Sequence, residues 1–121
     1  MATALWIAAG GAAGTLARYG MAGFINQSNH PWGTVAVNIL GSTALGFLIG
    51  LWRFEHPADR HLAVTIGLLG GFTTFSTFAL DTILVWEGGQ PLLAMISVTA
   101  SVVGSLAGAV VGLMAGRALG A

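Results

Sequence analysis

Four long apolar stretches dominate the pattern of hydrophobic and polar positions along the chain. Charged residues are absent from residues 1–17, 19–52, 61–80 and 88–116. Each stretch is close to the ~20 residues that a helix needs to cross a bilayer. The pattern therefore predicts an all-α membrane protein, a single domain over residues 1–121 with four transmembrane helices at about 3–24, 32–52, 61–86 and 92–117.

Composition supports a membrane location and excludes several other classes. Hydrophobic residues make up 55% of the chain and charged residues 7%, with a mean hydropathy of +0.85. The formal net charge is zero, so no basic surface for nucleic acid is expected, and the lipid bilayer is the predicted partner. The chain has no cysteine, which excludes thiolate chemistry. A cleaved signal peptide is an alternative for the first span, but no basic residue precedes its apolar run.

Small residues recur at helical spacing and predict close packing between the spans. The fourth span has a glycine at every fourth position, and the first two spans each have one such pair: Gly104, Gly108, Gly112 and Gly116; Gly10 and Gly14; Gly46 and Gly50. In lipid, such residues let helix backbones approach closely. Four thin helices enclose little space, so a pore or pocket is expected to need a second copy, most simply in a homodimer.

The third span contains a polar motif, GLLGGFTTFSTFALD at residues 67–81. Gly70 and Gly71 favour an interruption of the helix, and the hydroxyl residues after them compete for backbone hydrogen bonds. A broken span exposes carbonyls at the end of one half-helix and amides at the start of the next, which attract cations and anions respectively. The alternative is a glycine kink that only lets another helix cross.

Other side chains in the apolar spans are candidates for an anion pathway. Phe75 and Phe78 share a helix face, and their ring edges carry the positive part of the quadrupole; the alternative is simple packing. The Asn38 amide could donate to an anion or bond another helix, and Thr34 lies one turn earlier on its face. Arg18 is the one cation within a span and could attract anions or extend to the headgroups.

The remaining polar residues do not indicate catalysis. Asp81 lies near the end of the third span and is interpreted as a solvated or structural cap, with a functional role as the alternative. His30, His56 and His61 fall in or beside the connecting segments without the spacing of metal ligands, and no catalytic triad is present. The sequence therefore does not predict an enzyme. The sequence also places Arg18, in the first span, apart from the polar motif of the third span.

Three motifs resemble the Fluc, or CrcB, family of fluoride channels: GGAAGTLARYG, PWGTVAVNILGS and GGFTTFSTFALD, at residues 10–20, 31–42 and 70–81. The resemblance implies an antiparallel homodimer of dual topology with two fluoride pores. It also implies a structural sodium ion at the dimer centre, held by the backbone carbonyls of Gly70 and Thr73.

The same resemblance assigns roles to several side chains. Phe75, Phe78 and Asn38 line the pore, Arg18 lies in its vestibule, and Ser76 and Thr77 form a polar track. Asp81 stands where many relatives have glutamate, and Ser97 stands where some have tyrosine. Ser101 and Ser105 are further expected pore-lining hydroxyls.

The arginine count gives a different expectation for topology. With both termini on one side, Arg53, Arg60 and Arg117 oppose Arg18 alone, which favours a single orientation. The family resemblance implies the antiparallel arrangement instead, and we take the latter as the expectation because four charges give only a weak bias.

The resulting expectation is passive fluoride export across the cell membrane, giving fluoride resistance. Two alternatives come from other classes: a proton-coupled exporter of the small multidrug type, which needs a buried carboxylate, and a non-conducting structural membrane subunit. Glu55 lies in a connecting segment, and the first two spans contain no acidic residue.

Overall fold

The computed structural model describes residues 1–25, 31–53 and 57–120, and these residues are all helix or connection, without strand. The expected all-α fold is confirmed. The helical elements of the described ranges are α1 (Ala2–Ile25), α2 (Trp32–Trp52), α3 (Asp59–Leu62), the π-helix η1 (Ala63–Leu69), α4 (Gly70–Phe72), α5 (Phe75–Glu87) and α6 (Pro91–Leu119). His30, Glu55 and His56 lie outside the described residues.

Three helical stretches among the described residues are long and apolar enough to cross a bilayer: Trp32–Trp52, Asp59–Glu87 and Pro91–Leu119. The chain is therefore a multi-pass membrane protein. These stretches coincide with the second, third and fourth predicted spans. The first predicted span corresponds to α1, which has 24 residues; its crossing of the bilayer stays a prediction.

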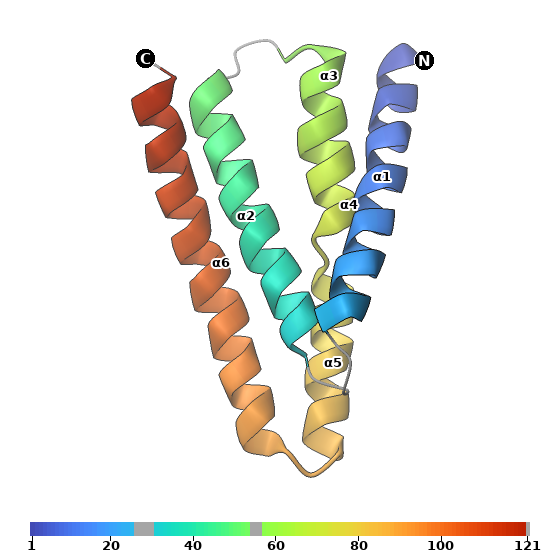
Figure 1. Ribbon diagram of the computed structural model, residues 1–121, viewed down its shortest axis with the longest axis vertical. Coiled ribbons are helices and arrows are strands. Elements are labelled where there is room, and N and C mark those ends of the chain that lie inside the picture. The colour runs from blue at the N-terminus through green and yellow to red at the C-terminus, as the bar shows by residue number, and fades with distance from the viewer. Residues whose placement is uncertain (26–30, 54–56, 121) are drawn as a thin grey trace.

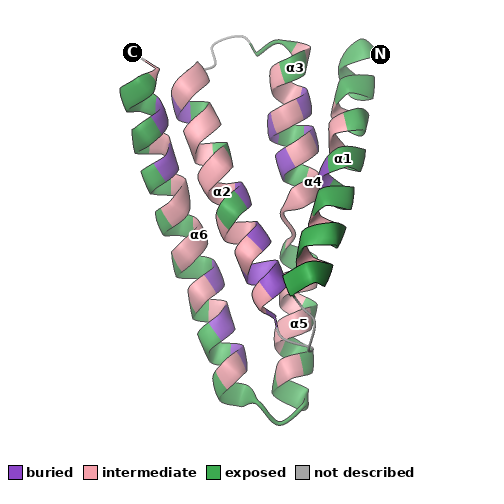
Figure 2. Ribbon diagram, in the orientation of Figure 1, coloured by how far each residue is buried: buried purple, intermediate pink, exposed green. Residues whose placement is uncertain are grey.

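The helices form two packed groups (Figure 1). The most extensive contact joins α2 and α6, while α1 packs on η1 and α4, and α5 packs on the first part of α6. Both chain termini lie at the same end of the molecule. Buried residues form stripes on the facing sides of the helices, and the outer face of α1 is mostly exposed (Figure 2).

The α2–α6 contact depends on the glycine series of α6. A Cβ atom on Gly112 would overlap the Thr43 carbonyl oxygen, and one on Gly116 would overlap the Phe47 carbonyl oxygen. Gly108 meets the Thr43 side chain in the same way. The close packing predicted for the fourth span is confirmed, and its partner is the second span.

The glycines of α1 also allow close packing of two backbones, here against η1 of the third helical stretch. A Cβ on Gly10 would overlap the Ala63 carbonyl oxygen, and a Cβ on Gly14 would overlap that of Leu68. Both of these carbonyl oxygens belong to η1. Helix α1 thus packs backbone to backbone on the third helical stretch.

The third stretch has two features that the sequence analysis did not place. Its helix stops at Phe72, and Thr73 and Thr74 are extended before α5 begins; we call these two residues the interruption. Gly70 and Gly71, where the interruption was expected, are helical, so that position was wrong. The preceding residues Ala63–Leu69 form a π-helix, which was not predicted.

Replacing Gly112 by alanine should lower the unfolding free energy by about 1 to 3 kcal/mol, because the added methyl forces the α2 and α6 backbones apart. Denaturant titration of the detergent-solubilised protein measures this change. Gly23→Ala is the matched control, since nothing lies within 4 Å of its ideal Cβ. That variant should gain up to ~1 kcal/mol from helix propensity. Equal effects of the two changes would contradict the packing argument.

Candidate functional site

The interruption is built from two threonines that act on different helices. Their backbone angles are φ −88°, ψ 152° at Thr73 and φ −153°, ψ 124° at Thr74. The Thr73 amide and hydroxyl both donate to the Leu69 carbonyl at 3.0 Å, which closes the last turn of α4. The Thr74 hydroxyl accepts from the Thr77 amide at 3.3 Å and caps α5. Thr73 therefore completes the last turn of one helix, and Thr74 caps the start of the next.

Asn38 of α2 holds the extended backbone through both ends of its amide group. Its Oδ1 accepts from the Thr74 amide at 2.7 Å, and its Nδ2 donates to the Thr74 carbonyl at 2.9 Å. This pair of hydrogen bonds resembles the pairing of two neighbouring strands. Of the two interpretations of Asn38, the structure displays the interhelical one. The second Nδ2 hydrogen has no partner among the described residues and remains a donor.

These bonds change the hydrogen bonding of two carbonyls near the interruption. In a continuous helix the Thr74 amide would bond the Gly70 carbonyl, and the Thr77 amide would bond the Thr73 carbonyl. Here the first amide donates to Asn38 and the second to the Thr74 hydroxyl. The Gly70 and Thr73 carbonyls have lost their helical donors, at the C-terminal end of a half-helix where partial negative charge gathers.

Arg18 reaches the same half-helix from α1. Its Nε donates to the Gly71 carbonyl at 3.1 Å, and the side chain is half-buried. A cation at the C-terminus of a helix is stabilised by the helix dipole. The expectation that Arg18 lies apart from the polar motif was wrong, because the packing of α1 on α4 brings them together.

An open groove of about 370 Å³ lies beside the interruption. It is lined by residues of α2, the interruption, α5 and α6: Asn38, Ser42, Thr73, Thr74, Phe75, Phe78, Ser101, Val102, Ser105 and Leu106. The groove thus gathers Asn38, both phenylalanines and both serines from the candidate set. Ser42 was missed by the sequence analysis, although it lies four residues after Asn38 and so shares its helix face.

The two phenylalanines belong to the lining of this groove. Their ring centroids are 5.4 Å apart and the rings are inclined by 58°. Phe75 is 77% exposed on the isolated subunit. Many other large apolar side chains of this membrane protein are exposed as well, Phe24 to 78% among them.

Ser101 supplies a polar group to the wall of the groove. It is 5% exposed, and its Oγ has no hydrogen-bond partner among the described residues. Ser97, one turn earlier, is buried as well but donates to the Ala94 carbonyl at 2.9 Å. A buried hydroxyl without a partner is unfavourable, so Ser101 is the better candidate ligand group of the two.

The other candidate residues lie outside the groove lining. The Thr34 hydroxyl is buried and donates to the Asp81 carboxylate at 2.8 Å. Ser76 lies with its Oγ 3.3 Å from the Thr74 hydroxyl, and Thr77 contributes the capped amide of α5.

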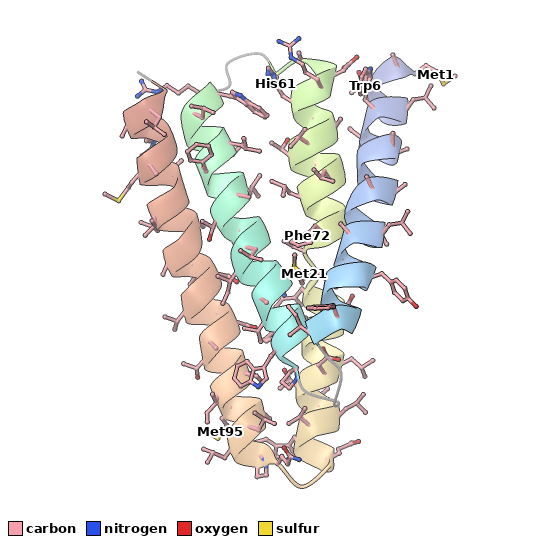
Figure 3. The ribbon with its side chains drawn as sticks, viewed as in Figure 1. Met1, Trp6, Met21, His61, Phe72 and Met95 are labelled. Carbon is pink, nitrogen blue, oxygen red and sulfur yellow. The ribbon has the colours of Figure 1, made fainter. Side chains whose placement is uncertain are left out.

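The structure also gives the surroundings of the one described histidine. The His61 ring lies 4.5 Å from the Trp52 ring, centroid to centroid, and its Nδ1 accepts from the Ala58 amide at 3.1 Å. In the described ranges, no group of three or more His, Cys, Asp or Glu side chains is arranged to hold a metal. Figure 3 shows His61 at the end where the termini lie and Phe72 near the middle of the long axis.

Comparison with known proteins gives one consistent family. A family model described as "CrcB-like protein, Camphor Resistance (CrcB)" matches residues 5–113. A fluoride-specific ion channel FluC from Paracoccus denitrificans is 48% identical, covering 97% of this chain and 96% of the relative. Proteins of the same name from Geobacter sulfurreducens and Citrifermentans bemidjiense are 42% and 40% identical, covering 98% and 95% of this chain and 100% and 97% of the relatives.

Replacing Asn38 by leucine should lower the unfolding free energy by about 1 to 3 kcal/mol, since it leaves two part-buried backbone groups of Thr74 without their partner. Hydrogen exchange at the Thr74 amide should accelerate in parallel. Thr99→Val is the control, because the exposed Thr99 hydroxyl bonds only the Met95 carbonyl within α6. Wild-type stability of the Asn38 variant, with a protected Thr74 amide, would contradict the assignment.

Proposed function

The chain belongs to the CrcB family, and we propose that it forms a passive, fluoride-selective channel. The observation that carries the proposal is the gathering of Asn38, Ser101, Phe75 and Phe78 around one open groove beside the interruption. Relatives at 40% to 48% identity carry the name fluoride-specific ion channel, a name for a transport protein and not for an enzyme.

The groove offers hydrogen bonds and dipoles in place of a full charge. The second Nδ2 hydrogen of Asn38 and the Ser101 hydroxyl are donors, and the phenylalanine edges present positive potential. Such groups can replace part of the water shell of a small anion. A fixed cation at the narrowest point would hold the ion too strongly, because conduction requires sites that both bind and release.

Other candidate residues complete the route in this proposal. Arg18 binds Gly71 through Nε only, and its remaining N–H groups attract anions to a vestibule. Ser76 and Thr77 form a polar track along α5, and Ser105 adds a hydroxyl to the groove lining. Thr34 is not part of this route, because its single hydroxyl hydrogen is donated to Asp81.

A second copy of the chain completes the pore. The groove is open and Phe75 is largely exposed, so a single subunit leaves the route unenclosed. In the proposed dimer, four-span subunits with α1 as the first span insert antiparallel, and two equivalent pores form at the interface. A two-fold symmetric interface repeats each contact and therefore generates both pores at once.

The proposed dimer holds one structural sodium ion at its centre. The Gly70 and Thr73 carbonyls fit this role because both have lost their helical donors and Gly70 is exposed on the subunit. Carbonyl oxygens at the end of a half-helix are suitable sodium ligands. Two carbonyls from each subunit supply about four ligands in a symmetric dimer. When bound, the ion neutralises the negative ends of the two half-helices.

The direction of transport follows from the membrane potential. The protein is a multi-pass protein of the cell membrane, and a negative interior drives anions outward. Passive efflux of fluoride without ATP would give the cell fluoride resistance. An exporter of the multidrug type would instead need a buried carboxylate for proton exchange, and a structural subunit would carry no flux.

Phe75→Ile and Phe78→Ile should each slow fluoride efflux by about tenfold, because the positive ring edge is lost; a tenfold change corresponds to roughly 1.4 kcal/mol at the barrier. Efflux from proteoliposomes, followed with a fluoride electrode, measures the rates, with chloride as the selectivity control. Phe24→Ile, on the exposed part of α1, should leave the rate unchanged. Wild-type protein that releases no fluoride would eliminate the proposed channel.

The antiparallel arrangement predicts that Gln90→Cys is labelled by a membrane-impermeant maleimide in about half of the molecules in intact cells, because both orientations are inserted. The absence of native cysteine makes the label specific, and exposed Gln90 carries no charge that could alter the orientation. Val37→Cys, which is 0% exposed, is the negative control. Labelling of all molecules or of none would contradict dual topology.

A further inference from the structure

Gly41 of α2 lies directly against the interruption. A Cβ atom at this position would overlap the Cγ2 methyl of Thr73 and lie 3.3 Å from Cδ1 of Phe72. Gly41 is buried inside a continuous helix, where glycine is less favourable than alanine. The residue therefore has a steric reason to be glycine, and the group that needs the space belongs to Thr73.

Gly41 and Asn38 contact the interruption from one face of α2, because residues three apart are neighbours on a helix surface. Asn38 holds the backbone of Thr74 by two hydrogen bonds. Gly41 admits the side chain of Thr73, whose hydroxyl is fixed by its bond to the Leu69 carbonyl at 3.0 Å. With the hydroxyl fixed, the methyl has one direction left, and this direction points at Gly41.

We infer that Gly41 is a positioning residue that sets the place of Thr73, and with it the Thr73 carbonyl and the start of α5. The inference rests on the proposed function, in which that carbonyl binds sodium and α5 carries the two phenylalanines. A methyl at position 41 displaces Thr73 away from α2. The displaced carbonyl then binds sodium less well, and the phenylalanines lose their alignment with the groove.

A size-exchange experiment tests the inference with Gly41→Ala, Thr73→Ser and the double variant. Thr73→Ser removes only the Cγ2 methyl and keeps the hydroxyl that bonds Leu69. We expect Gly41→Ala to slow fluoride efflux from proteoliposomes at least about tenfold, as overpacking in a tight contact does. It should also raise the sodium concentration needed for half-maximal flux. Thr73→Ser alone is the reference for the double variant: adding Gly41→Ala to Thr73→Ser should slow efflux by no more than about threefold relative to Thr73→Ser, since the shorter side chain leaves room for the added methyl.

Gly46→Ala is the matched control on the same helix. Its added methyl would overlap the Ala109 carbonyl oxygen of α6, a contact that does not involve the interruption. This variant should lower the unfolding temperature without changing the sodium requirement, and Thr73→Ser should not rescue it. Rescue of Gly46→Ala by Thr73→Ser would overturn the inference.

The remaining outcomes are decisive as well. Full activity of Gly41→Ala, or a double variant no better than Gly41→Ala, overturns the inference. If Gly41→Ala fails to fold, the inference requires that the double variant folds. A double variant that also fails to fold overturns the inference. If wild-type protein carries no fluoride, the proposed function fails, and the unfolding temperatures of the four proteins still test the coupling between positions 41 and 73. If the change in unfolding temperature of the double variant then equals the sum of the changes of the two single variants, the coupling is absent and the inference is overturned.

Discussion

The pairing of the Asn38 side chain with the Thr74 backbone is the interaction on which the site depends. Inside a membrane a backbone amide or carbonyl without a partner is costly, and extended backbone survives only where protein or water satisfies it. Asn38 satisfies both groups of one peptide residue at 2.7 and 2.9 Å. By taking the Thr74 amide, it also withdraws the helical donor of the Gly70 carbonyl. Asn38 therefore permits the interruption and also leaves the Gly70 carbonyl free of its helical donor.

Helix α2 is the fixed element against which the rest is placed. On one side it packs on the glycine series of α6, with backbone contacts such as that between Gly112 and Thr43. On another side it presents Asn38 and Gly41 to the interruption. Because α6 contributes Ser101 and the interruption contributes Thr73 and the start of α5, the width of the groove follows from two contacts of the same helix. Rigid backbone contacts of this kind transmit a displacement instead of absorbing it.

The sequence alone predicted the helices and their packing better than the geometry of the interruption. Absence of charge locates the spans, and glycine spacing locates the close contacts. The interruption was expected at Gly70 and Gly71 because glycine favours irregular backbone. Gly71 is instead a packing residue, since a Cβ there would lie 2.7 Å from the Gly11 carbonyl oxygen. The helix ends where the Thr74 amide, which would continue it by bonding the Gly70 carbonyl, donates to Asn38 of α2 instead. The contact of Arg18 with Gly71 depends on how α1 packs, and the π-helix has no marker in the local sequence.

The charges near the site are engaged in ways that leave the groove neutral. Arg18 donates to the carbonyl end of α4, where a cation is stabilised by the dipole. The Asp81 carboxylate accepts from Thr34 and lies outside the groove lining. The amide end of α5 is capped by an uncharged hydroxyl from Thr74 and not by a carboxylate. An acidic cap, which would be at least as favourable for α5 itself, would place a negative charge beside Phe75 and repel an anion. The choice of threonine at this cap is thus explained by the proposed path of the ion, because helix stability alone does not require it.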